Sequence, residues 1–263
     1  MSFPIRLGGT NRDLAFSITS LNDGSVIITG DFDGIVAFGS TTLTSAGDSD
    51  IFIAKLNRDG SLAWATQAGG SAEDDGEGIS SLPNGSSIIT GSFKSKVEFE
   101  IGSGDELTAV DLKDIFIAKL DSNGNFVWMK KAGGSSNDGG YAVSTLSDGS
   151  SIITGSFSGS ATFGSTPLNG SGHTDIFVTK LDSNGNFLWA TKAGGALNQA
   201  GRGVSTLSDG RAITTGYFNS TTVFGSSSLT SAGSADIFTA AIDTNGDWIS
   251  ALDLTPPKIA ITD

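Results

Sequence analysis

The chain alternates short apolar runs with polar turns, and the clearest example is the stretch from residue 133 to residue 193. Four runs there are suited to β-strands, at residues 141–146, 151–157, 175–181 and 186–192. Asp148 and Gly149 separate the first two runs, and an Asp-Gly pair in that place is a strong hairpin signal. No apolar pattern with a 3.6-residue period outlasts a turn. The pattern therefore predicts four antiparallel strands and no helix.

The same pattern is written four times along the chain. Gly-Gly pairs begin at Gly8, Gly69, Gly133 and Gly194, which are spaced by 61, 64 and 61 residues. The same spacing separates Phe38, Phe99, Phe163 and Phe224, so the register also holds inside each unit. A fixed period of this kind is the signature of a repeat architecture. We therefore expect four units, at residues 8–68, 69–132, 133–193 and 194–254.

Each unit also contains a predicted side hairpin between its second and third long strands. In the third unit it covers residues 160–168, where Pro167 disfavours a place in a central ladder because proline has no N–H to donate. The second unit is three residues longer than the others, and the difference falls between Phe99 and Asp114. An insertion confined to this hairpin identifies it as a surface feature.

A tryptophan recurs on the predicted fourth strand, at Trp64, Trp128 and Trp189. In the fourth unit Ser250 takes this position, and Trp248 lies two residues earlier. Because two residues make one strand period, Trp248 is expected to face the same side of its sheet as the others. The Trp, Phe and Ile-Ile positions are expected to pack between units, where burying one Trp or Phe contributes about 2 to 3 kcal/mol.

Four-stranded antiparallel units that recur at this length are typical of β-propellers. The predicted fold class is all-β, a propeller of four blades over residues 1–254. The alternative is half of an eight-bladed ring that a second chain completes. Residues 1–7 align with a fourth strand, so they either complete the last blade and close the ring or are left over from a longer array. Residues 255–263 depart from the repeat, and the proline pair Pro256-Pro257 is typical of a linker.

Composition narrows the class of partner. The formal net charge is -13, from 28 Asp and Glu against 15 Lys and Arg. Nucleic acids and anionic membranes are disfavoured as partners, because both are bound through Lys and Arg. No apolar run approaches the roughly 18 residues of a membrane helix, so no membrane insertion is expected. The chain has no cysteine, which excludes disulfides and thiol chemistry.

Residues 133–157, followed by Phe163-Gly164, resemble the bacterial SBBP repeat. That family places a Gly-Gly pair, an Asp-Gly, a short apolar run, a second Asp-Gly or Asn-Gly, an apolar run ending in Thr-Gly, and then Phe-Gly. Residues 118–128 also resemble the family's Ala-Lys-Leu-Asp-x-x-Gly-x-x-x-Trp segment. The resemblance covers nearly the whole chain outside the two ends. It implies a β-propeller in a large secreted or surface-attached bacterial protein, in rings of more blades than four units supply.

Four aspartates precede Ile-Phe at the same place in every unit: Asp50, Asp114, Asp175 and Asp236. In a closed ring their carboxylates could converge and bind Ca²⁺ through oxygen. The interpretation we favour is that each accepts backbone N–H groups where its strand begins. The turns at residues 121–124, 182–185 and 243–246 are similar to the first half of an EF-hand loop, but they lack its glutamate, and tight-turn geometry explains them. No other cofactor is expected.

Residues that are private to one unit are better candidates for binding a single ligand. These are Lys94 and Lys96 in the second unit, His173 in the third, and Gln199, Arg202 and Arg211 in the fourth. Drift on a solvated surface would explain the same differences. The acidic loop at residues 73–77 could bind a cation, although a solvated charged loop is the more ordinary interpretation. His173 is the only histidine, and no catalytic residue is predicted.

These features favour a non-enzymatic scaffold or recognition module of a larger bacterial protein that is extracellular or at the cell surface. Its ligand would be a protein or a glycan, and its assembly a monomer or homodimer. The alternative is a lectin-like propeller with one shallow glycan site per blade. A hydrolase acting on glycans or phosphate esters ranks lowest. Its sialidase version would need clustered arginines, and no arginine occupies a shared repeat position.

Overall fold

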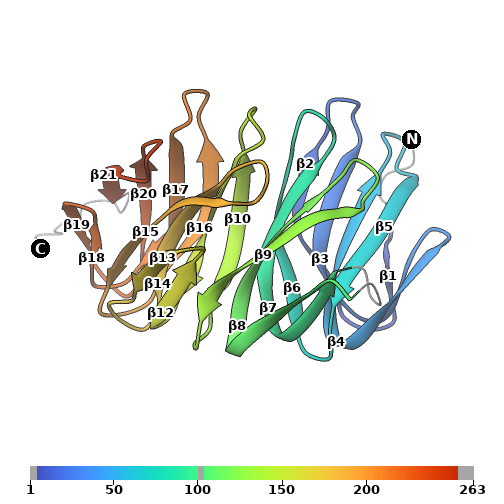
Figure 1. Ribbon diagram of the computed structural model, residues 1–263, viewed down its shortest axis with the longest axis horizontal. Helices are drawn as coiled ribbons and strands as arrows, with labels where there is room; N and C mark the ends of the chain where they lie inside the picture. The colour runs from blue at the N-terminus through green and yellow to red at the C-terminus, as the bar shows by residue number, and fades with distance from the viewer. Residues whose placement is uncertain (1–4, 100–103, 254–263) are drawn as a thin grey trace, which may run out of the picture.

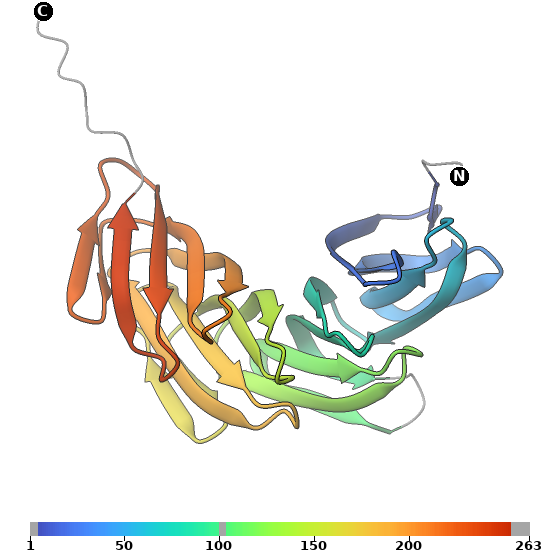
Figure 2. The ribbon, with the colours of Figure 1, turned by 90° about the horizontal axis from the view of Figure 1, so that it is seen from above.

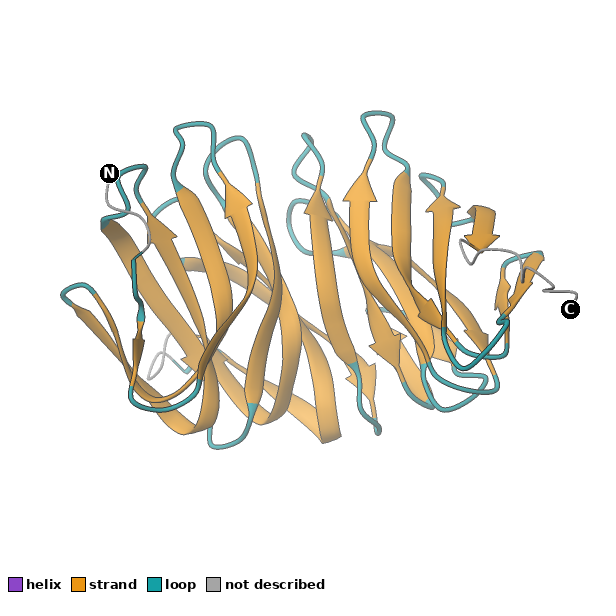
Figure 3. Ribbon diagram, turned by 180° about the vertical axis from the view of Figure 1, so that it is seen from behind, coloured by secondary structure: helices purple, strands orange, loops and turns teal. Residues whose placement is uncertain are grey.

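The computed structural model describes residues 5–99 and 104–253, and these residues form an all-β structure (Figure 1). Among the described residues there is no helix, and hence none that could span a membrane. The strands are joined by short loops, as Figure 3 shows. This confirms the all-β class predicted from the alternation of apolar and polar residues.

Every unit contributes four main strands. The first strands are β2 (Asp13–Ser20), β6 (Asp74–Ser81), β10 (Gly139–Thr145) and β16 (Gln199–Thr206). The second strands are β3 (Val26–Phe38), β7 (Ser87–Phe99), β11 (Ser151–Phe157) and β17 (Ala212–Phe218). The third strands are β4 (Thr41–Leu56), β8 (Glu106–Leu120), β14 (Asp175–Leu181) and β20 (Asp236–Ile242). The fourth strands are β5 (Leu62–Gly69), β9 (Phe126–Gly134), β15 (Phe187–Gly195) and β21 (Trp248–Asp253). Within each unit they pair antiparallel in this order, for example β10 with β11, β11 with β14 and β14 with β15.

The predicted side hairpins are present, and they link neighbouring units. They are separate strands in the third unit, β12 (Ser160–Phe163) and β13 (Thr166–Asn169), and in the fourth, β18 (Thr221–Phe224) and β19 (Ser227–Thr230). In the first two units they continue the second and third strands. Each hairpin pairs with the end of the preceding fourth strand, as in Gly133↔Thr162 and Gly194↔Val223. The short strand β1 (Gly8–Gly9) pairs in the same way with Val36 and Ala37 of the first unit.

The Gly-Gly pairs are explained by this linkage. A Cβ atom on Gly134 would lie 1.9 Å from the carbonyl oxygen of Ser160 in the adjoining hairpin. Gly133 has a positive φ of 136°, and a Cβ there would lie 2.4 Å from a carboxylate oxygen of Asp114. Both positions therefore exclude a side chain, for a conformational and a steric reason.

The four units follow an arc whose two ends do not meet (Figure 2). The first strands lie against one another in the order β2, β6, β10, β16, and β2 and β16 stand at opposite ends of the row. The closed four-bladed ring expected from the sequence is therefore not formed in this structure. The fourth strand of the last unit, β21, pairs with β20, so the amino-terminal segment does not complete the last blade. The expected linker at residues 255–263 and residues 1–4 of the expected amino-terminal strand lie outside the described residues. Residues 5–7 are described and belong to no strand.

Phenylalanine rings fill the junctions between units. At the junction of the second and third units, Phe163 and Phe177 are fully buried and their ring centroids lie 4.7 Å apart. They share one core cluster with Ile88 and Ile115 of the second unit. The junction on each side has the same composition, with Phe99 and Phe116 in one and Phe224 and Phe238 in the other. The Phe and Ile positions of the repeat therefore pack between units, as predicted.

The recurring tryptophans form hydrogen bonds that link each unit to the next. The indole Nε1 of Trp128 donates to the carbonyl oxygen of Ser183 at 3.2 Å, and that of Trp189 donates to Thr244 at 3.0 Å. The indole Nε1 of Trp248 instead donates to the carbonyl oxygen of Lys192 in the preceding unit, at 2.9 Å, and its ring packs edge-on against Phe224. The expectation that Trp248 shares the side of the other tryptophans is therefore wrong. A β-bulge lies between the two positions, and one extra residue reverses the facing of the strand.

Replacing Trp189 by alanine is expected to lower the melting temperature. The change removes the bond to Thr244 and the ring that covers Gly246, where a Cβ atom would lie 2.8 Å from the indole. We expect a loss of about 2 to 3 kcal/mol in unfolding free energy from the uncovered surface alone. The neighbouring Leu188→Ala, whose side chain is 55% exposed, serves as the control in a thermal melt. Equal melting temperatures for the two variants would contradict the assignment of Trp189 to the junction.

Candidate functional site

The four repeated aspartates each bond within their own unit. Asp50 accepts from the backbone N–H of Ala46 at 2.9 Å and Asp114 from Val110 at 3.0 Å. Asp175 accepts from Ser171 and Asp236 from Ala232, so every one of them bonds to the residue four positions earlier. Within the described ranges, no three carboxylate, histidine or cysteine groups gather as a metal site. Binding of Ca²⁺ by these four residues stays a prediction.

A second set of side chains, buried in every unit but the first, faces the first set across the Gly-Gly pairs. It comprises Asp13, Asp74, Asp138 and, in the fourth unit, Gln199. Asp138 accepts from Gly134 N–H at 2.7 Å and from Ser158 N–H at 3.0 Å. Gln199 accepts from Gly195 N–H at 3.3 Å and donates to the carbonyl oxygen of Asn219 at 3.2 Å. Gln199, a candidate ligand-binding residue, is thus fully buried in the scaffold.

Burial makes Asp74 and Asp138 of this set reluctant to ionise. Loss of hydration raises the pKa of Asp74 to about 8, and the neighbouring Asp50 carboxylate adds to the rise. The same cause raises the pKa of Asp138 to about 7, with a smaller contribution from Asp114. A neutral glutamine in the fourth copy of this position agrees with a site that tolerates the uncharged form.

The other private residues do not come together. Lys94, Lys96 and His173 are exposed, and Lys96 forms an ion pair with Glu106 of the same side hairpin. Arg211 lies in the turn between β16 and β17, where its Nε donates to Asp209 at 2.8 Å. Of the six candidate residues, Arg202 alone lies on the surface of a first strand among other unit-specific side chains.

Arg202 occupies a β-bulge that recurs in every first strand. The pairing of the first strand with the second shifts by one residue at Phe16, Glu77, Tyr141 and Arg202, which are equivalent positions of the repeat. A bulge bends its strand and redirects the side chain of the extra residue, and bulges are common next to functional sites. The bulge is present at the same position in all four units, whereas the side chain at that position is different in each. We call these four residues the bulge residues.

Two bulge residues and a neighbouring tyrosine form a stacked group. The guanidinium carbon of Arg202 lies 4.0 Å from the ring centroid of Tyr141 and 5.9 Å from that of Tyr217. The Tyr141 hydroxyl lies 3.0 Å from Ser156 Oγ, within hydrogen-bond distance. A cation over an aromatic face is attracted by the quadrupole of the ring. Arg202 is thereby held in place while it remains exposed.

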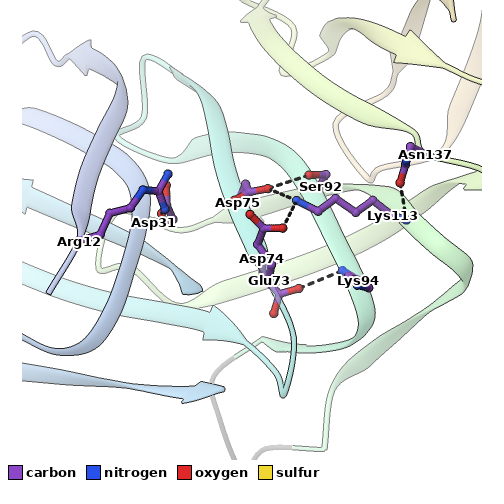
Figure 4. Close-up of polar contacts among 9 residues, drawn as sticks. All are labelled: Arg12, Asp31, Glu73, Asp74, Asp75, Ser92, Lys94, Lys113 and Asn137. Atoms are coloured by element: carbon purple, nitrogen blue, oxygen red, sulfur yellow. Dashed lines mark hydrogen bonds and ion pairs between the residues drawn. The ribbon is translucent and has the colours of Figure 1, made fainter. Parts of the chain in front are cut away.

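Charged side chains of the second unit form another group (Figure 4). Lys113 Nζ lies 2.7 Å from Asp75 and 2.9 Å from Glu73, and Ser92 Oγ donates to Asp75 at 3.2 Å. The backbone N–H of Lys113 donates to Oδ1 of Asn137 in the next unit, at 3.5 Å. Arg12 and Asp31 of the first unit form a separate ion pair. The acidic loop is therefore only partly solvated: Asp74 is buried and begins β6, and Asp75 is paired.

These groups line a pocket of about 300 Å³ between the second, third and fourth units. Its walls carry Asp75, Glu77 and Lys113 on one side and Tyr141, Ser156 and Arg202 on the other. No hydrogen bond joins Glu77 to another side chain in the described part of the chain, and loss of hydration raises the pKa of this carboxyl. The pocket therefore offers a fixed cation, a carboxyl group and an aromatic face. We call it the bulge pocket.

Sequence reasoning identified Arg202 but missed Tyr141, Tyr217, Lys113 and Glu77 as partners. A usable signal was present. The bulge residues lie between small residues in every unit, Gly76 and Gly78 around Glu77 being one example. Aligning the units shows one position that changes chemical class in each copy while its flanks stay small.

One distant relative by sequence suggests a repeat β-structure, and the comparisons with known proteins show no more than this. No protein-family model matches the chain. It is 24% identical over 272 aligned residues to an uncharacterized WD repeat-containing protein of Acanthamoeba polyphaga mimivirus, across 80% of this chain and 20% of that protein. The chain thus spans about a fifth of the length of this relative. A protein of unknown function from Bacteroides caccae, known from its crystal structure, is similar over 91% of this chain and 81% of its own, with 10% identity and a TM-score of 0.41.

Proposed function

We propose that the protein is a non-enzymatic recognition module that binds a segment of another protein in the bulge pocket. The observation that carries the proposal is the recurrent bulge, which presents four different side chains from one constant backbone. Repeat scaffolds commonly hold their stability in shared positions and their binding specificity in variable ones. The bulge residues have this distribution, whereas the buried Phe, Ile and Asp positions are nearly the same in each unit.

The chemistry of the pocket favours a protein ligand. Tyrosine and arginine are the residues most enriched, with tryptophan, among those that dominate binding energy at protein interfaces. Arg202 is already stacked on Tyr141, so less side-chain entropy is lost when a ligand binds. The net charge of -13 draws a basic segment of the ligand toward the surface.

We further propose that the module belongs to a larger bacterial protein that is secreted or attached to the cell surface. This part of the proposal rests on the resemblance to the SBBP repeat and on the acidic, cysteine-free composition. It is independent of the bulge pocket, and immunodetection of the natural protein in culture supernatant and surface fractions tests it. Recovery from the cytoplasmic fraction alone would contradict it.

Selection of displayed random peptides on the immobilised protein tests the binding proposal. Peptides that bind are then measured against Arg202→Ala and against Arg211→Ala, which removes another exposed arginine from a remote turn. We expect Arg202→Ala to weaken binding about 30-fold, as for an interface residue worth about 2 kcal/mol, and Arg211→Ala to leave it unchanged.

Two outcomes would count against the proposal. Peptides whose affinity is the same for the wild type and for Arg202→Ala would place the binding surface elsewhere. Specific binding on a glycan array, sensitive to Arg202→Ala and unaccompanied by any peptide binder, would favour the lectin alternative. Four equal glycan sites at this surface are disfavoured, because Phe16, Glu77, Tyr141 and Arg202 share no chemistry.

A further inference from the structure

Arg202 presents hydrogen-bond donors that no described part of the chain uses. Arg6, Arg12 and Arg211 each donate to a backbone carbonyl or to a carboxylate. Among the described residues, no hydrogen bond or ion pair engages the guanidinium of Arg202, whose carbon lies 4.0 Å from the centroid of the Tyr141 ring. An aromatic ring attracts the cation through its quadrupole but supplies no oxygen acceptor to the N–H groups. These donors line the bulge pocket and are free for a ligand.

The second cation of the bulge pocket is already neutralised. Lys113 Nζ lies 2.7 Å from Asp75 and 2.9 Å from Glu73. Because two carboxylates face one ammonium, Lys113 presents no net positive charge to a ligand. Of the described cations that line this pocket, Arg202 is therefore the one that can pair with an incoming anion.

The acidic residues of the pocket leave room for a ligand anion. Asp75 is paired, and Asp138 is buried with its oxygens accepting the backbone N–H groups of Gly134 at 2.7 Å and Ser158 at 3.0 Å. Glu77 lacks a side-chain partner within the described ranges. Loss of hydration, with a smaller contribution from the Asp75 charge, raises the pKa of Glu77, so it carries its charge less readily than an exposed glutamate. The repulsion that an anion meets here is thereby reduced.

The shape of the guanidinium selects the kind of anion. Its planar fork of N–H groups matches the two oxygens of a carboxylate, which it binds through two parallel hydrogen bonds. The fork is held in place, since Tyr141 stacks on it and the centroid of Tyr217 lies 5.9 Å from the guanidinium carbon. At about 300 Å³ the pocket is at the lower end of the range of small-ligand sites, so it admits one side chain or one chain end.

We propose that Arg202 binds a carboxylate of the ligand through two parallel N–H···O bonds, with Tyr141 and Tyr217 as positioning residues. The inference rests on the proposed function, because it names the group of the bound protein segment that enters the bulge pocket. This group is an Asp or Glu side chain or the carboxyl end of the segment, and both present the same two oxygens.

The acidic surface of the protein is compatible with this contact. Charges separated by more than a Debye length, about 8 Å at physiological ionic strength, are largely screened, whereas the bound carboxylate touches Arg202 directly. The net charge of -13 therefore acts on the residues that flank the carboxylate. A segment with one acidic group in the pocket and basic residues on either side satisfies both requirements.

Selection from two peptide libraries tests the class of ligand. One library contains all amino acids and a free carboxyl end, and the other lacks Asp and Glu and ends in an amide. We expect the first to yield binders that Arg202→Ala weakens, and the second to yield binders that are about 30-fold weaker, as for the loss of one dominant contact.

The outcomes separate this inference from the proposed function. Equal affinities from the two libraries, both lost in Arg202→Ala, would overturn the carboxylate and leave the bulge pocket as the recognition site. Binders that are insensitive to Arg202→Ala, or no binders from either library, would overturn the proposed function and this inference together.

Analogues of a selected peptide distinguish the two sources of the carboxylate. In one analogue the carboxyl end is amidated, and in the others each acidic residue is replaced in turn by Asn or Gln. One of these changes is expected to weaken binding about 30-fold, and the others are expected to leave it nearly unchanged. Full binding by every analogue would contradict the proposal.

Arg202→Lys tests the fork, because it keeps the positive charge and loses the paired donors. It is expected to bind the selected peptide about 10-fold more weakly than the wild type. Arg58→Lys makes the same exchange at an exposed arginine in the turn between β4 and β5, and it is expected to bind as the wild type does. Equal binding by Arg202→Lys and the wild type would show that charge alone suffices, which contradicts bidentate binding.

Tyr141→Leu tests the positioning role through the preference for the peptide over its neutralised analogue. Removing the ring is expected to lower this preference about threefold, since the guanidinium is no longer held. Tyr141→Phe keeps the ring and is expected to keep the preference. A merely structural role would lower the melting temperature without changing this ratio, so an unchanged preference in Tyr141→Leu would contradict the assignment.

Discussion

Phe177→Ala is expected to destabilise the protein by about 3 to 5 kcal/mol, the usual range when a fully buried phenylalanine is truncated. Phe177 is 0% exposed and belongs to the junction between the second and third units, with Phe163 at 4.7 Å between ring centroids. The glycine beneath the ring, Gly155, leaves no side chain that could fill the space, because a Cβ there would lie 2.7 Å from the ring. The cavity should therefore persist. Urea unfolding followed by tryptophan fluorescence measures the loss.

Val127→Ala is the matched control for this change, because Val127 is 56% exposed on the fourth strand of the second unit. It is expected to change the stability by less than about 0.5 kcal/mol, as is usual for surface substitutions. A loss below about 1 kcal/mol for Phe177→Ala would show that the junction collapses around the gap. The rigid packing between units would then be contradicted.

The wild-type protein is expected to lose stability as the pH rises from about 4 to about 8. Asp74 and Asp138 have folded-state pKa values raised by burial to about 8 and about 7, above the value of 3.8 for an unperturbed Asp. The folded state therefore binds protons more tightly than the unfolded chain. The stabilising contribution is fully present below pH 4 and is lost as the pH passes through the raised values. Asp138→Gln copies the neutral residue of the fourth unit, so it should flatten this dependence.

Asp148→Asn is the control with the opposite sign. Asp148 accepts hydrogen bonds from the side chain and backbone of Ser150, and these hold its pKa below the usual value. Its contribution is present above pH 4 and lost below it, so Asp148→Asn should leave the slope between pH 4 and pH 8 unchanged. Melting temperatures across this range measure both variants. A wild-type melting temperature that rises over the range, or an undiminished slope in Asp138→Gln, would contradict the account.

The four units and their strands could be predicted almost completely from the sequence, because each is specified locally. The turn at Asp148 and Gly149 shows why. Gly149 has the positive φ of 85° that the turn requires, and Asp148 accepts from the backbone N–H of Ser150 at 2.9 Å. Alternation of apolar and polar residues on either side then sets the facing of both strands.

The arrangement of the units could not be predicted from the period. Whether the units close into a ring depends on the angle between neighbours, which side-chain volumes such as those of Phe163 and Phe177 determine. Periodicity carries no information on that angle. The prediction of the side of the sheet that Trp248 faces was wrong for a related reason. The bulge at Ile249 adds a residue that the alternation of apolar and polar positions does not reveal.

The bulge pocket was only partly predictable. The search for private polar residues found Arg202, but it also chose Gln199, which the fourth unit uses to cap its own backbone. Tyr141 was not recognised as a site residue, because it lies in a predicted strand and aromatic residues are common in β-strands. A bulge changes the direction of one side chain without changing the composition of its strand, so composition alone cannot locate it.

The triple variant Glu77→Ser, Tyr141→Ser, Arg202→Ser tests the central claim most directly. Its affinity for a peptide selected on the wild type is the measurement, and its melting temperature shows whether the scaffold is intact. The account predicts that binding is abolished while the melting temperature stays within about 2 °C of the wild type, because these side chains lie outside the junction cores. Retained binding in a folded triple variant would contradict the claim that the bulge residues form the recognition site.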